Sequence, residues 1–169
     1  MSDKKVAVVT GSAAGLGKGI ATRLAQDGFA VVLHDINADN LAQTKAEFDK
    51  NGWQNIAVQG NVANRADQFR LAEEAVKAFG HLDVWVNNAG VESVGTFLSL
   101  DEQEIDRVLD VNIKGVIFGT QAAAEQMKKQ SGIGKIINAC SIAGHESYEM
   151  LSLYSATKHP VLSFTHSTA

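Results

Sequence analysis

A short apolar segment that leads directly into a glycine-rich turn and then a helix is the feature that most restricts the fold of this chain. Residues 6–9 are all apolar, and residues 11–17 have the pattern Gly-x-x-x-Gly-x-Gly. Such an apolar run is typical of a parallel strand buried on both faces. Glycines at the following turn let the backbone approach a pyrophosphate, and the first turn of the helix offers it free N–H groups. The segment predicts a dinucleotide site, although the glycines could simply make a tight turn.

A second apolar strand, at residues 31–33, leads to an acid that supports the nucleotide interpretation. Asp35 lies twenty residues beyond Gly15, close to the spacing at which dinucleotide-binding folds place a ribose-binding carboxylate. A carboxylate there would repel a 2′-phosphate, and positions 12–14 and 36–38 hold no Arg or Lys to attract one. We therefore expect NAD to be preferred over NADP by ~100-fold or more.

A tyrosine and a lysine near the C-terminus suggest acid–base chemistry. Tyr154 and Lys158 are four residues apart, and Ser141 precedes the tyrosine by thirteen positions. Residues at i and i+4 share one face of a helix. A phenol is a poor acid or base at neutral pH unless a nearby cation lowers its pKa. The alternative is an amphipathic helix that carries one aromatic side chain and one solvated lysine.

Taken together, these motifs resemble those of the short-chain dehydrogenase/reductase family over essentially the whole chain. The turn after Thr10 resembles the family's cofactor loop, and residues 87–90, Asn-Asn-Ala-Gly, resemble the motif that steadies its central sheet. Within the family, residues 112–119, 136–141 and 143–145 most resemble bacterial acetoin (diacetyl) reductases, also called 2,3-butanediol dehydrogenases.

The resemblance assigns roles to individual residues. Tyr154 would be the general acid or base, Lys158 would assist it and bind the nicotinamide ribose, and Ser141 would hold the substrate oxygen. Asn112 would anchor a water in a proton relay. The implied cofactor-binding residues are Gly11, Ser12, Gly15, Leu16, Gly17, Asp35, Asn61, Val62, Asn88, Ala89, Gly90, Tyr154 and Lys158.

Composition restricts the setting of this chemistry. The chain has 169 residues, is 45% hydrophobic and has a net charge of −4, which suits one core-forming domain and argues against nucleic acid as a partner. We expect no membrane segment, and the single cysteine, Cys140, excludes an internal disulfide and fits a reducing cytoplasm. The five histidines lack metal-ligand spacing, so no metal is expected.

The coarse pattern alternates strands and helices without a repeat or linker, which predicts one doubly wound α/β domain of the Rossmann type over residues 1–169. The right-handed crossover rule and the resemblance together give the strand order 3-2-1-4-5. Expected strands lie near 5–10, 30–35, 55–60, 82–87 and 134–140, and expected helices near 15–28, 38–51, 65–79, 103–130 and from 152 onward.

Three features differ from the family pattern. The chain stops at Ala169, whereas the family continues into a sixth and a seventh strand and a substrate lid, so we expect a C-terminally incomplete domain whose fifth strand is an exposed edge. Pro160 lies inside the last helix, where we expect a kink that moves His159 away from helical geometry and could re-aim Lys158. Asn61 lies where many family members have Asp; because Asn can still accept a hydrogen bond, we expect weaker but not lost recognition of adenine.

Two function classes follow from the sequence. The first is an NAD-dependent reductase of small ketones or diketones, such as diacetyl and acetoin, in which Tyr154 acts as acid or base. The second is a truncated, inactive chain that binds the dinucleotide without turning over. The resemblance further implies a homotetramer that uses the helix near 103–130 and the tyrosine-bearing helix as contacts.

Overall fold

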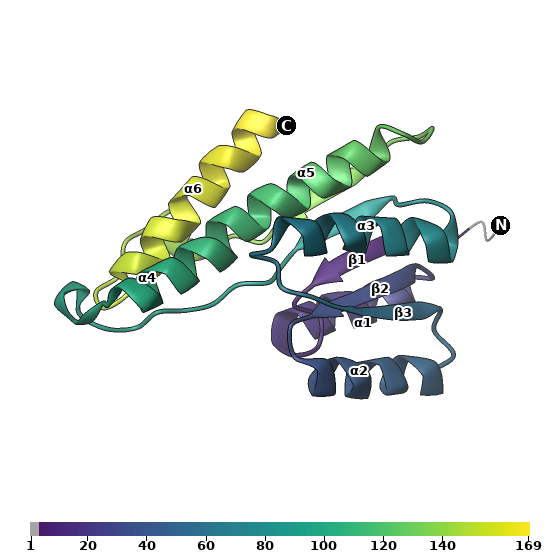
Figure 1. The fold of residues 1–169 in the computed structure, drawn as a ribbon, viewed down its shortest axis with the longest axis horizontal. Helices are drawn as coiled ribbons and strands as arrows, with labels where there is room; N and C mark the ends of the chain where they lie inside the picture. The colour runs from purple at the N-terminus through teal and green to yellow at the C-terminus, as the bar shows by residue number, and fades with distance from the viewer. Residues whose placement is uncertain (1–3) are drawn as a thin grey trace.

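The computed structural model describes residues 4–169, in which helices cover both faces of one parallel sheet (Figure 1). The five strands are β1 (Val6–Thr10), β2 (Ala30–Asp35), β3 (Asn55–Gln59), β4 (Val84–Asn87) and β5 (Lys135–Asn138). The α-helices are α1 (Gly15–Gln26), α2 (Ala38–Lys50), α3 (Arg65–Phe79), α4 (Glu102–Leu109), α5 (Gly115–Met127) and α6 (Ser152–Thr168). Short 3-10 turns η1 (Phe97–Ser99) and η3 (Ile142–Gly144) and a π-helical segment η2 (Asp110–Lys114) complete the fold.

The strands lie in the order β3-β2-β1-β4-β5, and every neighbouring pair is parallel. Strand β1 is central, with Val8 opposite Val32 on one side and Trp85 on the other. This order confirms the predicted doubly wound fold. Because all strands run the same way, the turn after β1, the acid at the end of β2 and the residues after β4 meet at one edge of the sheet.

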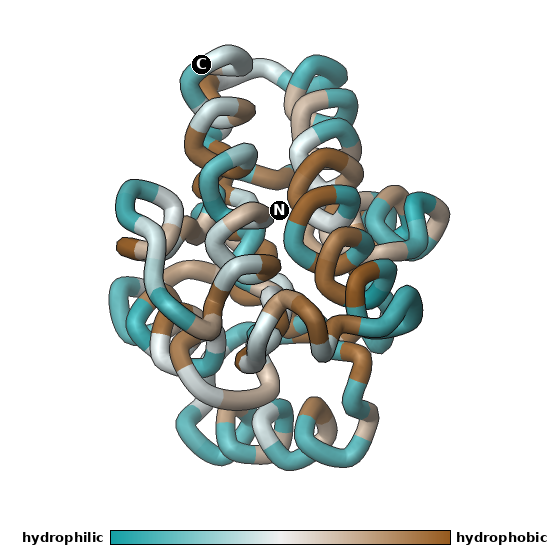
Figure 2. Tube along the Cα trace, turned by 90° about the vertical axis from the view of Figure 1, so that its left-hand side faces the viewer, coloured by the Kyte–Doolittle hydropathy of each residue, from teal (hydrophilic) through white to brown (hydrophobic). Residues whose placement is uncertain are grey.

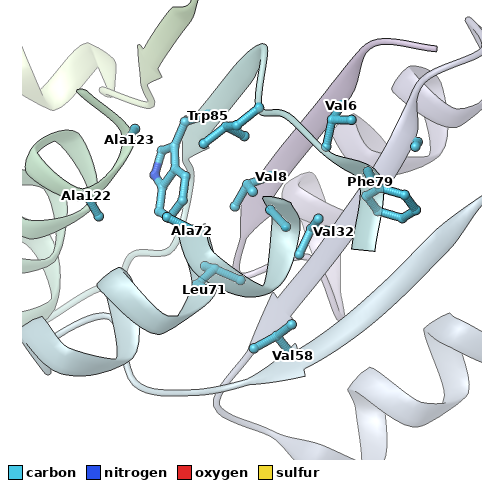
Figure 3. Close-up of a cluster of buried hydrophobic side chains, with 13 residues drawn as sticks. Val6, Val8, Val32, Val58, Leu71, Ala72, Phe79, Trp85, Ala122 and Ala123 are labelled. Atoms are coloured by element: carbon cyan, nitrogen blue, oxygen red, sulfur yellow. The ribbon is translucent and has the colours of Figure 1, made fainter. Parts of the chain in front are cut away.

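Alternate strand residues build a separate hydrophobic core on each face of the sheet. Val8, Val32 and Trp85 face α3 and α5, where they pack with Leu71 and Phe79 (Figure 3). The continuous apolar runs of β1 and β2 fit a sheet that is covered on both faces, because side chains on each face of the strands are then buried.

The opposite face packs against α1 and α2. Val9, Val31 and Leu33 contact this side, where the Phe48 ring meets Trp53 edge-on at a centroid distance of 5.0 Å. Figure 2 shows helix α2, at the bottom of the view, with mainly hydrophilic outer turns, while hydrophobic segments gather in the interior. Both faces of the sheet are therefore covered by filled cores.

The single long helix expected near 103–130 was only partly correct. The structure divides it into α4, the π-helical η2 and α5, with the Gly115 N–H bonded to the Asp110 carbonyl five residues earlier. Single-turn π segments often occur at functional sites, and this one contains the buried Asn112. An extra residue in one turn shifts the phase of α5 relative to α4, which a 3.6-residue pattern does not reveal.

The kink expected at Pro160 was wrong in its main consequence, because α6 continues through it and His159 remains helical. Proline fixes φ near the helical value, so it removes one N–H donor without forbidding the helix. Packing of α6 against η3, η2 and α4, through buried residues that include Lys158 and Val161, outweighs the local penalty.

Strand β5 forms an edge of the described sheet, since it pairs only with β4. Ile137 on this strand is 50% exposed, as expected for an apolar edge strand without a covering element on one side. Within residues 4–169, none of the helices has the length and apolar character needed to cross a bilayer.

Candidate active site

A cavity of about 630 Å³ lies at the edge of the sheet where the carboxyl ends of the strands meet. It runs from the ends of β2 and β3, past the glycine turn after β1, to α6. The structure brings most of the predicted site residues into its wall: Gly11, Gly15, Leu16, Gly17, Asp35, Asn61, Val62, Asn88, Ala89, Gly90, Tyr154 and Lys158. Ser12, Asn112 and Ser141 do not line it.

The glycine turn has the geometry that a close ligand requires. Gly11 and Gly15 have positive φ angles of 64° and 52°, which glycine adopts without strain. A Cβ on Gly17 would overlap the Gly11 carbonyl oxygen and the side chain of Asn88. The glycines are therefore needed at these positions for the turn and for the contact between the loops after β1 and β4.

Helix α1 begins at this turn without a side-chain cap. The residue before it is Ala14, whereas Asn37 and Asn64 cap α2 and α3 through their side-chain oxygens. The first turn, Gly15 to Gly17, lines the cavity and contains no acidic residue. Uncapped N–H groups and the positive end of the helix dipole suit an anion such as a pyrophosphate.

The loops after β1 and β4 are tied together by hydrogen bonds. The Thr10 hydroxyl accepts from the backbone N–H groups of Asn88 and Ala89, at 3.0 and 3.1 Å. In return, Asn88 Nδ2 donates to the Thr10 carbonyl at 2.9 Å and to the Gly11 carbonyl at 3.3 Å. This arrangement fixes the wall of the cavity between the two strands.

Asp35 presents a fixed carboxylate at the end of β2. Its Oδ1 accepts from the Asn37 N–H at 3.0 Å, and its Oδ2 accepts from the Ala13 N–H at 3.2 Å. Each oxygen can accept a second hydrogen bond, and the residue lines the cavity. The arrangement could receive the two hydroxyls of a ribose.

Ser12 does not line the cavity, but its side chain bonds to strand β2 beside it. Its hydroxyl accepts from the His34 backbone N–H at 2.9 Å and is buried. The structure therefore places its side chain against β2, where it holds the glycine turn to the strand that carries Asp35. Cofactor contact by Ser12 stays a prediction.

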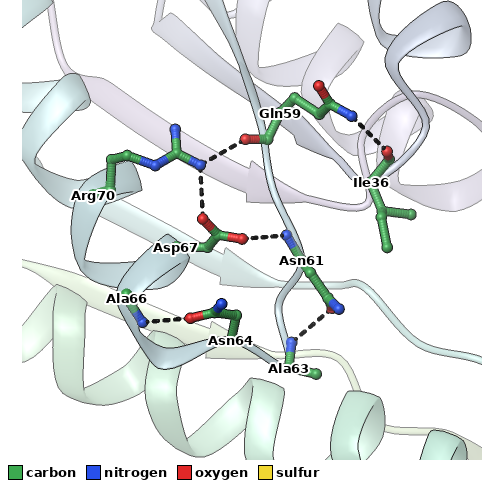
Figure 4. Close-up of polar contacts among 8 residues, drawn as sticks. All are labelled: Ile36, Gln59, Asn61, Ala63, Asn64, Ala66, Asp67 and Arg70. Atoms are coloured by element: carbon green, nitrogen blue, oxygen red, sulfur yellow. Dashed lines mark hydrogen bonds and ion pairs between the residues drawn. The ribbon is translucent and has the colours of Figure 1, made fainter.

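A polar network fixes the segment after β3 (Figure 4). Arg70 Nη2 donates to the Gln59 carbonyl at 2.8 Å and to Asp67 Oδ1 at 2.9 Å, while Asp67 Oδ2 accepts from the Asn61 N–H at 2.9 Å. The Asn61 hydrogen bond, followed by Arg70, lowers the pKa of Asp67. Asn61 Oδ1 accepts from the Ala63 N–H at 3.0 Å, which leaves it one further acceptor position.

Tyr154 and Lys158 line the other end of the cavity from successive turns of α6. Lys158 is only 5% exposed, and its Nζ lies 5.6 Å from the Tyr154 ring centroid and donates to the Ala139 carbonyl at 3.2 Å. Burial lowers the pKa of Lys158, with Cys140 opposing this shift. A desolvated ammonium beside a phenol is suited to proton transfer.

Asn112 is fully buried and uses its side chain to join three segments. Its Oδ1 accepts from the Val91 N–H at 2.9 Å, and its Nδ2 donates to the Val91 carbonyl at 2.9 Å and the Thr157 hydroxyl at 3.0 Å. The structure therefore uses the side chain to attach α6 and the loop after β4 to the π-helical segment. The predicted relay water stays a prediction.

Ser141 lies at the end of the β5 connection and starts the 3-10 turn η3. Its Oγ accepts from the Ala143 N–H at 3.2 Å, which leaves the hydroxyl proton available as a donor. The neighbouring Cys140, rather than Ser141, lines the cavity, and its Sγ lies 3.4 Å from the Lys158 carbonyl. A contact between Ser141 and substrate stays a prediction.

Sequence reasoning missed several residues of the cavity wall, among them His34, Ile36, Gly60, Glu92 and Arg107. Most follow a strand end, so parallel topology alone could have indicated them. Arg107 lies on α4 and donates to the Glu92 carbonyl at 3.0 Å while pairing with Glu104, a long-range contact without a local sequence signal. In the described part of the chain, His, Cys, Asp and Glu side chains form no group of three suited to a metal ion.

The doubly wound sheet, the uncapped glycine turn and the acid at the end of β2 define the class as a Rossmann-type nucleotide-binding domain. The family model described as "short chain dehydrogenase" matches residues 5–169. The chain therefore belongs to the short-chain dehydrogenase/reductase family, as the motifs had indicated.

Two curated relatives refine this likeness. The chain is 54% identical to "Diacetyl reductase [(S)-acetoin forming]" of Staphylococcus epidermidis over 98% of its own length and 64% of that relative's. It is 36% identical to "L-2,3-butanediol dehydrogenase" of Corynebacterium glutamicum over 98% of its length and 65% of that relative's. The chain thus spans about two thirds of each of these relatives and most resembles acetoin-forming reductases.

Solved structures agree with the fold. A short-chain dehydrogenase/reductase from Burkholderia phymatum in complex with NAD superposes with a TM-score of 0.95 at 35% identity, covering 98% of this chain and 59% of that one. A gluconate 5-dehydrogenase from Burkholderia cenocepacia in complex with NADP and tartrate gives a TM-score of 0.87 at 31% identity, covering 95% and 62%.

Proposed function

We propose that this chain carries the cofactor-binding and proton-transfer machinery of an NAD-dependent oxidoreductase that interconverts small ketones or diketones, such as diacetyl and acetoin, with secondary alcohols. One observation carries the proposal: Tyr154 and Lys158 line the same cavity as Asp35 and the uncapped turn Gly15–Gly17. A nucleotide bound along this wall would end beside a proton donor.

The cofactor-binding residues act through charge and close approach. The N–H groups of the first turn of α1 would hold the pyrophosphate, and the Asp35 oxygens would accept from the ribose hydroxyls. The structural relatives include complexes with both NAD and NADP, so Asp35 supports the choice of NAD, because its charge repels a 2′-phosphate.

The residues on α6 would manage the proton. When bound, the nicotinamide ring supplies or accepts the hydride. The Tyr154 hydroxyl would give its proton to the substrate oxygen in reduction and remove it in oxidation. Lys158, held by the Ala139 carbonyl, would favour the ionised phenol through its charge. Ser141 would donate to the substrate oxygen, and Asn112 would keep α6 in register with the loop after β4.

The curated relatives supply the substrate class, since the two described above are named for diacetyl, acetoin and 2,3-butanediol. The proposed setting is cytoplasmic, and the homotetramer implied by the resemblance also stays a prediction. Steady-state NADH oxidation with diacetyl, together with calorimetric binding of ADP-ribose, tests the proposal, because ADP-ribose needs only the adenosine and pyrophosphate contacts.

Tyr154→Phe removes only the hydroxyl, so ADP-ribose affinity should persist while turnover falls by at least ~10²-fold, the scale of a lost general acid. Lys158→Met should reduce turnover as well, because the ammonium is lost. Activity close to that of the unmodified chain in Tyr154→Phe would overturn the catalytic assignment. ADP-ribose binding without turnover in the unmodified chain would instead support the alternative of a dinucleotide-binding chain without activity.

A further inference from the structure

A histidine at the end of β2 is buried in the wall of the cavity without a protein partner for its ring. His34 is 1% exposed and lines the cavity beside Asp35. Among residues 4–169, neither His34 Nδ1 nor Nε2 has a hydrogen-bond partner. Both nitrogens have almost no accessible surface, and buried polar groups are almost always paired. A ligand atom in the cavity would therefore complete these hydrogen bonds only with the ring turned toward it.

A glycine just past the end of the neighbouring strand β3 makes room for this ring. A Cβ on Gly60 would lie 2.9 Å from His34 Nε2, closer than side-chain carbon atoms normally approach. The nearby polar groups already have other partners: Asp67 bonds to Asn61 and Arg70, and Arg70 also bonds to the Gln59 carbonyl. The surrounding network therefore holds the strand end in place and leaves the imidazole nitrogens free.

The order of the strands indicates which part of a dinucleotide His34 meets. The pyrophosphate site follows β1, and the ribose-binding Asp35 ends β2, so the base lies beyond them at β3. His34 is on β2, but its Nε2 lies next to Gly60, just past the end of β3. The imidazole is therefore at the end of the cavity that receives the base.

We propose that His34 is a further cofactor-binding residue, whose ring packs against Gly60 and hydrogen-bonds the adenine base; this inference rests on the proposed binding of NAD. Burial lowers the pKa of His34 to about 4, so the ring is neutral near pH 7 and offers one donor and one acceptor. Adenine carries ring-nitrogen acceptors and an amino donor, and either can be matched by a neutral imidazole.

Affinity for ADP-ribose, measured by calorimetry at pH 7, tests the contact. His34→Leu keeps most of the volume but removes both nitrogens, and should weaken binding about 5- to 20-fold, the scale of one hydrogen bond. His34→Gln keeps a polar group near Nε2 and should stay within about threefold of the unmodified chain. The matched control is His81→Leu, because His81 lies outside the cavity wall. This change should leave the ADP-ribose affinity unaltered.

A double-mutant cycle with Gly60 separates a binding role from a general loss of structure. Gly60→Ala should displace the imidazole and weaken ADP-ribose binding, whereas in the His34→Leu background the same change should add little further loss. Independent, additive losses would contradict the proposal. Circular dichroism and unfolding curves show whether each variant is folded, and His34→Gln provides the readout if His34→Leu is not.

The ¹⁵N chemical shifts of the His34 imidazole provide a further test, because they would not respond to ADP-ribose if the residue were only structural. The His34 nitrogen signals should shift on addition of ADP-ribose but not of inorganic pyrophosphate, which has no base. If ADP-ribose binds in an Asp35-dependent way while His34→Leu and the His34 signals are unaffected, the inference fails and the proposed function stands. If the unmodified chain does not bind ADP-ribose at all, both fail.

Discussion

The two ends of the cavity are built differently. At the end that Asp35 lines, every residue of β1 is buried and β2 is buried up to His34, with a core on each face. At the end that Tyr154 lines, β5 alternates between exposed and half-buried residues. The strands at the Asp35 end are therefore held by apolar packing, whereas the position of Tyr154 depends on how α6 is attached.

That attachment includes polar links between side chains. Asn87 Nδ2 donates to Asn138 Oδ1 at 2.8 Å, and Asn138 Nδ2 donates to the Thr165 hydroxyl at 3.0 Å, which links β4, β5 and α6. Asn112 adds a second link through Thr157. Such bonds give direction but contribute only about 1 kcal/mol each. The comparison therefore predicts that mutations in the two regions differ in whether they change the free energy of unfolding, ligand preference or self-association.

The largest expected effect is in the core between the sheet and α2, at the edge of the sheet opposite the cavity. Phe48→Ala should lower the free energy of unfolding by about 3–5 kcal/mol, because the side chain is 1% exposed and packs against Trp53. Urea denaturation followed by circular dichroism measures the change. A loss below about 1 kcal/mol would show that this core is less tightly filled than its burial implies.

The next largest effect is a pH dependence of the free energy of unfolding that His34 causes. Desolvation lowers its pKa from 6.5 to about 4, with Asp35 and Asp67 opposing the shift and Arg70 reinforcing it. Between these values the unfolded chain binds a proton that the folded chain does not. The free energy of unfolding should therefore fall by about 3 kcal/mol as the pH drops from 6.5 to 4.

His34→Leu isolates this contribution, because the carboxylates that titrate in the same range are unchanged. The difference in stability between the variant and the unmodified chain should shift in favour of the variant as the pH falls from 6.5 to 4. Parallel stability curves for the two proteins over this interval would mean that the imidazole is not desolvated in the folded state.

A smaller effect concerns cofactor choice. Asp35→Ser removes the charge that we propose lies opposite the ribose 2′-position. A preference of ~100-fold for ADP-ribose over 2′-phospho-ADP-ribose should therefore narrow by about tenfold or more. Calorimetry with both probes measures the ratio. Equal affinity for the two probes in the unmodified chain would rule out Asp35 as the selecting residue.

The smallest change in stability is expected at β5. Ile137→Lys replaces a side chain that is 50% exposed, so the free energy of unfolding should change by less than about 0.5 kcal/mol. An apolar edge strand invites pairing with another chain, and a lysine discourages it. Light scattering should therefore show self-association of the unmodified chain that the variant reduces; a monomeric unmodified chain would contradict this expectation.

Local rules predicted the elements whose causes are local. The apolar runs that became β1 and β2, the glycine turn and the acid at position 35 could all be read along the chain, and the crossover rule supplied the strand order. The i,i+4 spacing of Tyr154 and Lys158 likewise placed both residues at the cavity.

The parts that could not be predicted depend on contacts between distant segments. The His34 ring fits against Gly60, which follows the end of β3. Ser141 lies outside the cavity wall, where the chain turns into η3 directly after it. The helix continues through Pro160 because packing on η2 and η3 outweighs a local penalty. Sequence spacing contains none of these relationships.

The π-helical segment limits which insertions and deletions this part of the chain can accept. The Gly115-to-Asp110 bond spans one residue more than an α-helical bond, so η2 amounts to a one-residue insertion in an otherwise regular helix. Deleting one residue there would restore regular α-helical hydrogen bonds. It would also rotate α4 by about 100° relative to α5. Asn112 would lose its alignment with Val91 and Thr157. This segment should therefore tolerate substitution on its exposed side much better than any single-residue insertion or deletion.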